Sequence, residues 1–178
     1  MTIRFDNRVA IVTGAGNGIG KSHALSLAAL GAKVVVNDLG GTRDGSGNSL
    51  SAAEAVVQEI KAKGGDAMAN GANVAKYDEV TAMIDDAKKK WGRVDILVNN
   101  AGILRDKTFA KMEIDDFRLV LEVHLMGSVN CCKAAWETMR EQHYGRIVLS
   151  ASSSGLFGNF GQANCGAAKA AMVGLMNV

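Results

Sequence analysis

Apolar residues along the chain form two alternating patterns, short continuous runs and longer helical repeats. The short runs predict buried strands at 9–12, 33–36, 67–70, 94–98 and 146–150. Between them, apolar positions three and four residues apart predict helices after Gly20, from Ser51 with a capping box Ser51–Glu54, from Asp78, from about Asp115 to Gln142, and from near Cys165. Because strands and helices alternate, we expect an α/β fold in which a parallel sheet carries helices on both faces.

The first predicted strand runs into a glycine-rich stretch, Val12–Gly20, that leads directly into a helix. Glycine allows a sharp turn and a close approach of ligand, while the first N–H groups and the positive dipole end of the helix attract an anion such as pyrophosphate. The spacing is GxxxGxG, and the alternative is a simple strand-to-helix turn. The candidate cofactor-binding residues of this stretch are Gly14, Asn17, Gly18, Ile19 and Gly20.

The second predicted strand ends at Asp38, eighteen residues after Gly20. Dinucleotide-binding units place there the carboxylate that holds the adenosine ribose hydroxyls, although Asp38 could instead be a solvated strand end. Its charge would repel a 2′-phosphate, and the glycine stretch contains no Lys or Arg before Lys21, so NAD is predicted over NADP. These features indicate a Rossmann-type doubly wound parallel sheet, with residues 1–178 as a single dinucleotide-binding domain.

Composition narrows the classes of partner. The chain is 48% hydrophobic and 21% charged with a net charge of +2 from scattered residues, which favours a small-molecule substrate and argues against nucleic acid and membrane surfaces. Residues 1–6 lack a signal-peptide pattern and no apolar run approaches the length of a membrane span, so we expect a cytoplasmic protein. The three cysteines have no metal-ligand spacing, and we expect them to be reduced and no metal to be bound.

Four motifs in order resemble the short-chain dehydrogenase/reductase family. They are Thr13–Gly20, Asp38, Asn99–Gly102 after the fourth strand, and Ser152 followed at thirteen and seventeen residues by positions 165 and 169. The segments 36–41, 101–106 and 158–164 are most similar to the (3R)-hydroxyacyl-CoA dehydrogenase domain of multifunctional β-oxidation enzymes and its free-standing bacterial relatives. The resemblance covers the whole chain. It implies an NAD-dependent oxidoreductase, usually a dimer or tetramer, that transfers a hydride between nicotinamide and a secondary alcohol or ketone, with a 3-hydroxyacyl thioester as candidate substrate.

The resemblance also implies roles for individual residues. Asn73 and Val74 would lie near the adenine, and Asn100, Ala101 and Gly102 would allow the nicotinamide and its ribose to approach. Ser152, with Ser153 as an alternative, would hydrogen-bond the substrate oxygen. Lys169 would bind the nicotinamide ribose. His124 aligns with the family's catalytic asparagine, as it does in the hydroxyacyl-CoA group, and is a proton-relay candidate, although a buried histidine is more often structural.

Two departures from the family bear on activity. The family has Tyr-x-x-x-Lys, whose tyrosine exchanges the proton, and here that position is Cys165. A thiol lies closer to the backbone and cannot reach the place of the phenol oxygen, so water or His124 would have to carry the proton. Family members also continue with two further strands and a Pro-Gly motif, whereas this chain has no proline, and we expect it to be truncated after the fifth strand and part of the following helix. The alternative function is therefore a non-catalytic NAD-binding remnant or a fragment.

Overall fold

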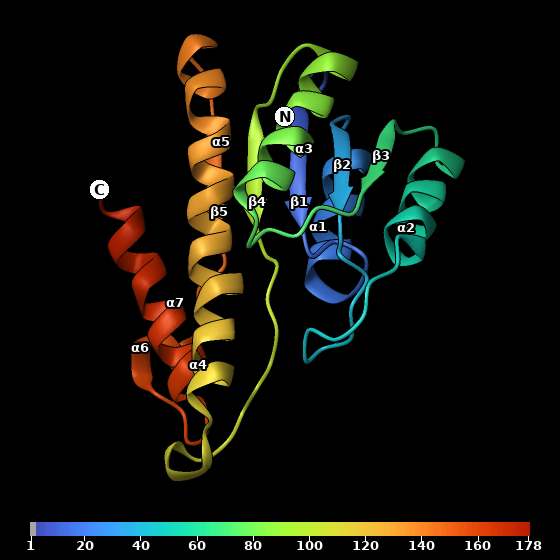
Figure 1. The fold of residues 1–178 in the computed structure, drawn as a ribbon. Coiled ribbons are helices and arrows are strands. Elements are labelled where there is room, and N and C mark those ends of the chain that lie inside the picture. The colour runs from blue at the N-terminus through green and yellow to red at the C-terminus, as the bar shows by residue number, and fades with distance from the viewer. Residues whose placement is uncertain (1–2) are drawn as a thin grey trace.

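The computed structural model of the protein describes residues 3–178, which form a five-stranded parallel sheet between layers of helices (Figure 1). Met1 and Thr2, part of the N-terminal segment that lacks a signal-peptide pattern, lie outside the described residues. In chain order the elements are β1 (Val9–Thr13), α1 (Gly18–Ala29), β2 (Lys33–Asn37), α2 (Ser51–Ala62), β3 (Ala67–Asn70), α3 (Tyr77–Trp91), β4 (Ile96–Asn99), the short η1 (Phe109–Lys111), α4 (Ile114–Leu121), the π-helical turn η2 (Glu122–Met126), α5 (Gly127–Glu141), β5 (Arg146–Leu149), α6 (Ser153–Phe157) and α7 (Ala163–Met176).

The strand order is β3-β2-β1-β4-β5, and every neighbouring pair is parallel. The chain builds outward from β1 to β3, then crosses back to place β4 on the other side of β1. This reversal confirms the predicted Rossmann-type doubly wound sheet. In such sheets the ligand crevice lies beyond the carboxyl ends of the strands where the order reverses, here at β1 and β4.

Alternate residues of the central strands belong to two hydrophobic cores, one on each face of the sheet. Ala10 and Val12 of β1 pack with the buried faces of α1 and α2, whereas Val9 and Ile11 pack with α3 and α5. All four residues are fully buried. Because helices cover both faces of the sheet, the strands read as continuous apolar runs rather than as an apolar–polar alternation.

The predicted element boundaries differ from the structure where side chains replace backbone partners. We expected the fourth strand at 94–98, but β4 begins at Ile96, because the N–H of Val94 donates to Oε1 of Gln142 at 3.0 Å and Nε2 of Gln142 donates back to the Val94 carbonyl at 2.7 Å. The predicted capping box at the start of α2 is wrong. Leu50 is the N-cap, and the Ser49 hydroxyl accepts the N–H of Ser51 at 3.3 Å.

The predicted helix from 115 to 142 is continuous from α4 to α5 but contains the unpredicted π-helical turn η2. This turn places His124 against the carboxyl end of the sheet, and the Ser128 hydroxyl donates to the His124 carbonyl at 2.7 Å. The last helix, α7 (Ala163–Met176), packs against α4 and η2. The predicted loop 151–164 also contains a short helix, α6, which packs on α7.

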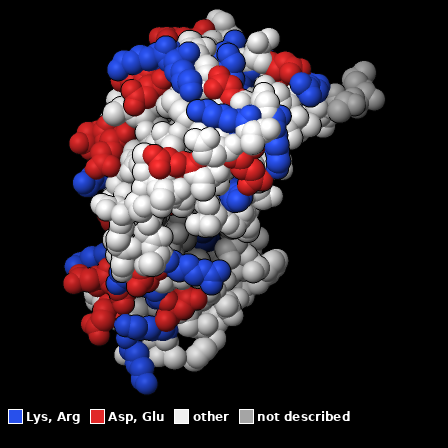
Figure 2. Space-filling view, turned by 90° about the vertical axis from the view of Figure 1, so that its right-hand side faces the viewer, with Lys and Arg blue, Asp and Glu red and all other residues white. Residues whose placement is uncertain are grey.

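The surface carries mixed charge. On the face drawn in Figure 2, Lys and Arg side chains lie among Asp and Glu side chains rather than in a patch of one sign. Within residues 3–178, no helix combines the length and the apolar character that crossing a bilayer demands.

Candidate functional site

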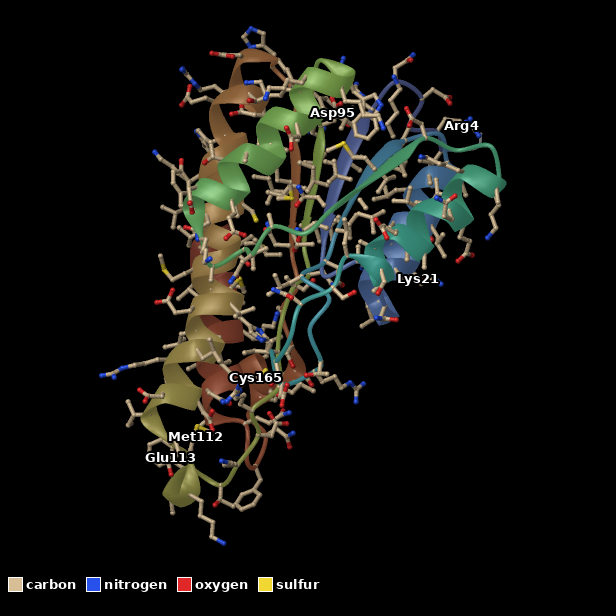
Figure 3. All side chains as sticks on the ribbon, turned by 45° about the vertical axis from the view of Figure 1, so that its right-hand side comes forward. Arg4, Lys21, Asp95, Met112, Glu113 and Cys165 are labelled. Atoms are coloured by element: carbon tan, nitrogen blue, oxygen red, sulfur yellow. The ribbon has the colours of Figure 1, made fainter. Side chains whose placement is uncertain are left out.

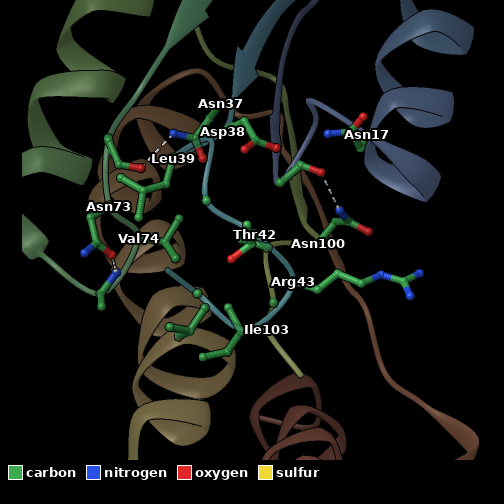
Figure 4. A pocket seen from close by; sticks show the side chains of 18 of the residues that line it. Asn17, Asn37, Asp38, Leu39, Thr42, Arg43, Asn73, Val74, Asn100 and Ile103 are labelled. Atoms are coloured by element: carbon green, nitrogen blue, oxygen red, sulfur yellow. Dashed lines mark hydrogen bonds between the residues drawn. The ribbon is translucent and has the colours of Figure 1, made fainter. Parts of the chain in front are cut away.

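A cavity of about 320 Å³ lies at the carboxyl ends of β1, β2 and β4, where the strand order reverses (Figure 4). Segments far apart in the sequence form its wall: the glycine loop, the end of β2 with the loop that follows, and residues 72–75 and 100–103. Leu119 and Val123 of the long helix close one side. The predicted cofactor-binding residues in the lining are Gly14, Asn17, Asp38, Asn73, Val74, Asn100, Ala101 and Gly102.

The glycines of the first loop divide between turn formation and close packing. Gly14 has φ +62°, and a Cβ added there would lie 2.8 Å from the Cα of Ala101. A Cβ at Gly20 would collide with the Gly14 carbonyl oxygen. Of the predicted cofactor residues, Gly18, Ile19 and Gly20 form the first turn of α1 rather than the cavity lining. Gly20 therefore sets how closely α1 approaches β1.

Asp38 connects two loops that border the cavity. One carboxylate oxygen accepts the N–H of Gly16 at 2.7 Å, and the other accepts the N–H of Gly40 at 2.7 Å. A Cβ at Gly16 would lie 2.8 Å from this carboxylate, so only glycine allows the contact. Two donors occupy two of about four lone-pair positions of a carboxylate. Asp38 can therefore accept further hydrogen bonds from hydroxyl groups in the cavity.

The ends of β1 and β4 are joined by side chains from both strands. Nδ2 of Asn100 donates to the carbonyls of Thr13 and Gly14 at 3.0 and 3.1 Å. In return, the Thr13 hydroxyl oxygen accepts the N–H groups of Asn100 and Ala101, each at 3.0 Å. On the opposite wall, Oδ1 of Asn73 accepts the N–H of Ala75 at 3.0 Å. The asparagines thus shape the cavity walls.

His124 is buried behind the cavity wall. The N–H of Ile103 donates to its Nε2 at 2.9 Å, and a Cβ at Gly102 would lie 2.7 Å from its Cε1. Within the described part of the chain, its Nδ1 has no hydrogen-bond partner. Burial, reinforced by the nearby charge of Lys169, lowers the pKa of His124 to about 4. The ring is therefore uncharged at neutral pH.

The other predicted catalytic residues lie beside the end of β5 and outside the cavity lining. Ser152 caps α6 by accepting the N–H of Ser154 at 3.2 Å. One turn apart on α7 lie Cys165 and Lys169, which are 7% and 9% exposed, and Nζ of Lys169 donates to the Ser150 carbonyl at 2.6 Å. Burial raises the pKa of the Cys165 thiol and lowers the pKa of Lys169. The thiol therefore stays protonated at neutral pH.

The sequence prediction missed the role of the loop after β2. Residues 41–48 form an exposed surface loop, as expected, but Gly41, Thr42, Arg43 and Gly45 also line the cavity. The glycine content of this segment indicated a turn-rich loop, but no local pattern indicates that its tip contacts residues near 104. As for metals, no three His, Cys, Asp or Glu side chains gather as a ligand group within residues 3–178.

The fold and the cavity define an α/β nucleotide-binding protein with its site at the reversal of strand order. Residues 8–178 match the short chain dehydrogenase family, and the protein belongs to this family. The chain is 52% identical to the peroxisomal multifunctional enzyme A of Dictyostelium discoideum over 99% of this chain and 40% of that protein. It is 48% identical to a 3-oxoacyl-[acyl-carrier-protein] reductase of Synechocystis over 94% of this chain and 64% of that protein.

Among solved structures, a 7α-hydroxysteroid dehydrogenase complexed with NADH and 7-oxo glycochenodeoxycholic acid superposes with a TM-score of 0.88. The two sequences are 35% identical, and the match covers 97% of this chain and 64% of the other. In each of these three comparisons the chain spans less than two thirds of its relative's length.

Proposed function

We propose that the protein binds NAD and transfers a hydride between its nicotinamide and a secondary alcohol or ketone, with 3-hydroxyacyl thioesters as the substrate class. The cofactor assignment rests on Asp38. Its carboxylate lines the cavity at the end of β2 and can accept further hydrogen bonds. The substrate class is supported by the reductase relative, whose name specifies a 3-oxoacyl group on an acyl-carrier protein.

The residues present fit a dinucleotide. The first turn of α1 contains no acidic residue and Asn17 makes no side-chain cap, so the N–H groups and the helix dipole there are available to a pyrophosphate. A Cβ at Gly18 would find open space, which leaves room for that group. Asp38 would hold the adenosine ribose, while Asn73 and Val74 would border the adenine.

At the other end of the cofactor, Asn100, Ala101 and Gly102 would border the nicotinamide ribose, and Lys169 would bind its hydroxyls from α7. Bound NAD supplies the hydride acceptor. Ser152 would position the substrate, because its oxygen accepts the Ser154 N–H and its own hydroxyl proton stays available for the substrate oxygen.

The residues of this site provide no efficient general acid/base for the proton transfer. A protonated, buried thiol at position 165 makes a poor base, and the low pKa of His124 leaves its neutral ring as the form present at neutral pH. Water or the neutral His124 would have to relay the proton. The chain as given should therefore turn over slowly, and cofactor binding without catalysis is the second candidate function, favoured by the burial of Cys165.

The experiment is an assay of NAD-linked oxidation of a (3R)-hydroxyacyl thioester by the unsubstituted protein, Cys165→Tyr and the matched control Cys165→Phe. A phenol hydroxyl supplies general acid/base help worth about 10²- to 10⁴-fold in rate, so Cys165→Tyr should exceed Cys165→Phe by that order. Turnover of the unsubstituted protein as fast as that of Cys165→Tyr would contradict this account of Cys165. NADH binding without turnover in all three proteins would support the non-catalytic function.

Assembly and location belong to the same proposal. Trp136 on α5 is 56% exposed and Met126 of η2 is 39% exposed, and a homo-oligomer would cover such apolar side chains. Light scattering after size exclusion would test this. The cytoplasmic location and the single domain 1–178, incomplete relative to the family, remain predictions. Fractionation against a peroxisomal marker would test the location.

A further inference from the structure

Hydrogen bonds join the two ends of the loop that follows β2. The N–H of Ser49 donates to the Leu39 carbonyl at 3.0 Å, and the N–H of Gly40 donates to Asp38 at 2.7 Å. Gly40 has φ +74°, and a Cβ there would collide with the Ser49 carbonyl oxygen. Residues 40–49 thus form a compact loop whose two ends touch, as in an Ω-loop.

The tip of this Ω-loop is fastened to the chain that follows β4. The N–H of Leu104 donates to the Arg43 carbonyl at 2.8 Å, and Nε of Arg105 donates to the Asp44 carbonyl at 2.9 Å. A Cβ at Gly45 would lie 3.2 Å from Ile103, which shows how closely the two segments pack. The loop therefore crosses from β2 to the β4 side along the cavity wall. Both attachments use backbone oxygens, so the Arg43 side chain takes no part in them.

Among residues 3–178, the ionisable residues that line the cavity are Asp38 and Arg43. Asp38 already accepts two N–H groups, whereas Arg43 forms no salt bridge within residues 3–178. The nearest basic residue on α1, Lys21, is paired with Glu59 of α2 at 3.0 Å. Arg43 is therefore the cation that the cavity offers to an anionic ligand.

The direction of the Arg43 side chain indicates which anionic group of a dinucleotide it would bind. In Figure 4 the guanidinium of Arg43 extends toward the side of the cavity where Asn17 and Asn100 lie, and away from Asn73 and Val74. Asn17 precedes the first turn of α1, the pyrophosphate position under the proposed function. A 2′-phosphate would instead lie beside Asp38.

We propose that Arg43 binds the pyrophosphate of the dinucleotide from the Ω-loop, while the N-terminus of α1 binds it from the sheet side. The inference rests on the proposed cofactor. A guanidinium offers several N–H donors in a fixed fork that matches two phosphate oxygens, and its charge offsets that of the pyrophosphate. The Ω-loop would thereby join the end of β2, the chain after β4 and the cofactor.

The test is calorimetric titration of NADH, NADPH and ADP-ribose into the unsubstituted protein, Arg43→Ala, Arg43→Lys and the control Arg140→Ala. Arg140 lies on α5 outside the cavity and pairs with Glu137. Arg43→Ala should weaken the affinity for all three ligands by about tenfold, the loss expected for a charged hydrogen bond. Arg43→Lys should lose less, and Arg140→Ala should bind as the unsubstituted protein does. The affinity of the unsubstituted protein should also fall more steeply with salt than that of Arg43→Ala.

Other outcomes overturn the assignment in distinguishable ways. A loss confined to NADPH would place the 2′-phosphate at Arg43, and an unchanged affinity for ADP-ribose would place the nicotinamide half there. Equal affinities of Arg43→Ala and the unsubstituted protein would overturn the role of Arg43 alone. Binding of none of the three ligands by the unsubstituted protein would overturn both this inference and the proposed function.

Discussion

The two ends of the sheet each hold an aspartate beside the central strands, and they use it differently. Figure 3 labels Asp95 at one end and Cys165 toward the other. Just before β4, at the amino end, the fully buried Asp95 accepts hydrogen bonds from Arg8 at 2.8 Å, from the N–H of Val9 at 2.9 Å, and twice from Arg93 at 2.6 and 2.7 Å. The guanidinium of the same Arg8 also lies over the ring of Tyr144, 3.6 Å from its centre.

At the carboxyl end, Asp38 accepts only two backbone N–H groups and borders an open cavity. A carboxylate whose acceptor positions are filled by its own protein can only stabilise the fold, whereas one with free positions can also bind a ligand. Motif and charge alone do not distinguish the two aspartates. The number of hydrogen bonds that each receives does.

The largest effect should follow from Asp95→Ala, which leaves two arginines without their carboxylate. Removing one partner of a buried ion pair costs about 3–5 kcal/mol, so the free energy of unfolding in urea should fall by that amount. NADH affinity, measured where the variant is folded, should be unchanged. A loss below 1 kcal/mol would contradict the structural role of the Asp95 cluster.

The same carboxylate predicts a pH dependence. Burial raises the pKa of Asp95, but hydrogen bonds from Arg93, Val9 and Arg8 outweigh burial and hold it below its ordinary value. The contribution of Asp95 to stability should be complete above pH of about 4, the unfolded pKa, and be lost as pH falls through the folded pKa. Urea unfolding of Asp95→Ala should accordingly show less acid dependence than that of the unsubstituted protein.

Gly102→Ala tests the close packing at the carboxyl end of the sheet by adding a methyl group. The new Cβ would lie 2.7 Å from the His124 ring, which would have to move away from Ile103. Overpacking of this kind costs about 1–3 kcal/mol of unfolding free energy, and NADH affinity should also fall because Gly102 lines the cavity. The matched control is Gly174→Ala on α7, where a Cβ meets no atom within 4 Å. Equal effects of the two substitutions would contradict the packing of Gly102 on His124.

Asp38→Asn should shift cofactor preference with a smaller energy. Loss of the charge removes the repulsion of a 2′-phosphate and weakens the acceptor for ribose hydroxyls, so the ratio of NADH to NADPH affinity should fall by about tenfold. Asp86→Asn, on the exposed side of α3, should leave the ratio unchanged. An unchanged ratio in Asp38→Asn would overturn the role of Asp38 in selecting NAD.

The smallest effect should be a gain in stability from Gly174→Ala itself. Glycine inside a helix costs about 0.5–1 kcal/mol relative to alanine because the unfolded chain has more freedom. Gly174 lies within α7 and its missing Cβ leaves open space. Urea unfolding would measure the gain, and a loss of stability would show that the space around Gly174 is filled in solution.

The pattern of apolar residues predicted the sheet and its helices, because the central strands β1, β2 and β4 are buried on both faces and α2, α3 and α5 each carry a regular buried stripe. The position of Asp38 at the end of the second predicted strand pointed to the cavity, whereas Asn73 and Asn100 were expected there from the family motifs, and all three line it. Arg43 was missed because its place depends on a hydrogen bond to Leu104, sixty-one residues away. Long-range contacts between loops leave no periodic signal.

The sequence also did not predict which backbone groups the Ser152 and Ser51 hydroxyls would contact. Both occur in sequences that favour capping, yet Ser152 caps a helix that was not predicted, whereas Ser51 lies inside the helix it was expected to cap. A hydroxyl can bond several nearby backbone groups, so the sequence does not specify which one it selects. The burial of His124 followed from no motif, because it depends on the π-helical turn.

That π-helical turn also sets the rotational register of everything after it. A π-turn holds one residue more than an α-turn, and each residue of an α-helix advances the face by about 100°. The buried stripe of α5, which includes Cys131, Ala135 and Met139, meets the sheet only because the extra residue is accommodated at Glu122–Met126. Deletion of one residue there would convert the π-turn into an α-turn and leave this stripe facing the sheet, whereas an insertion elsewhere in α5 would rotate the residues after it by about 100°. The π-turn thus lets the long helix contain one extra residue beside His124 without turning its buried face away from the sheet.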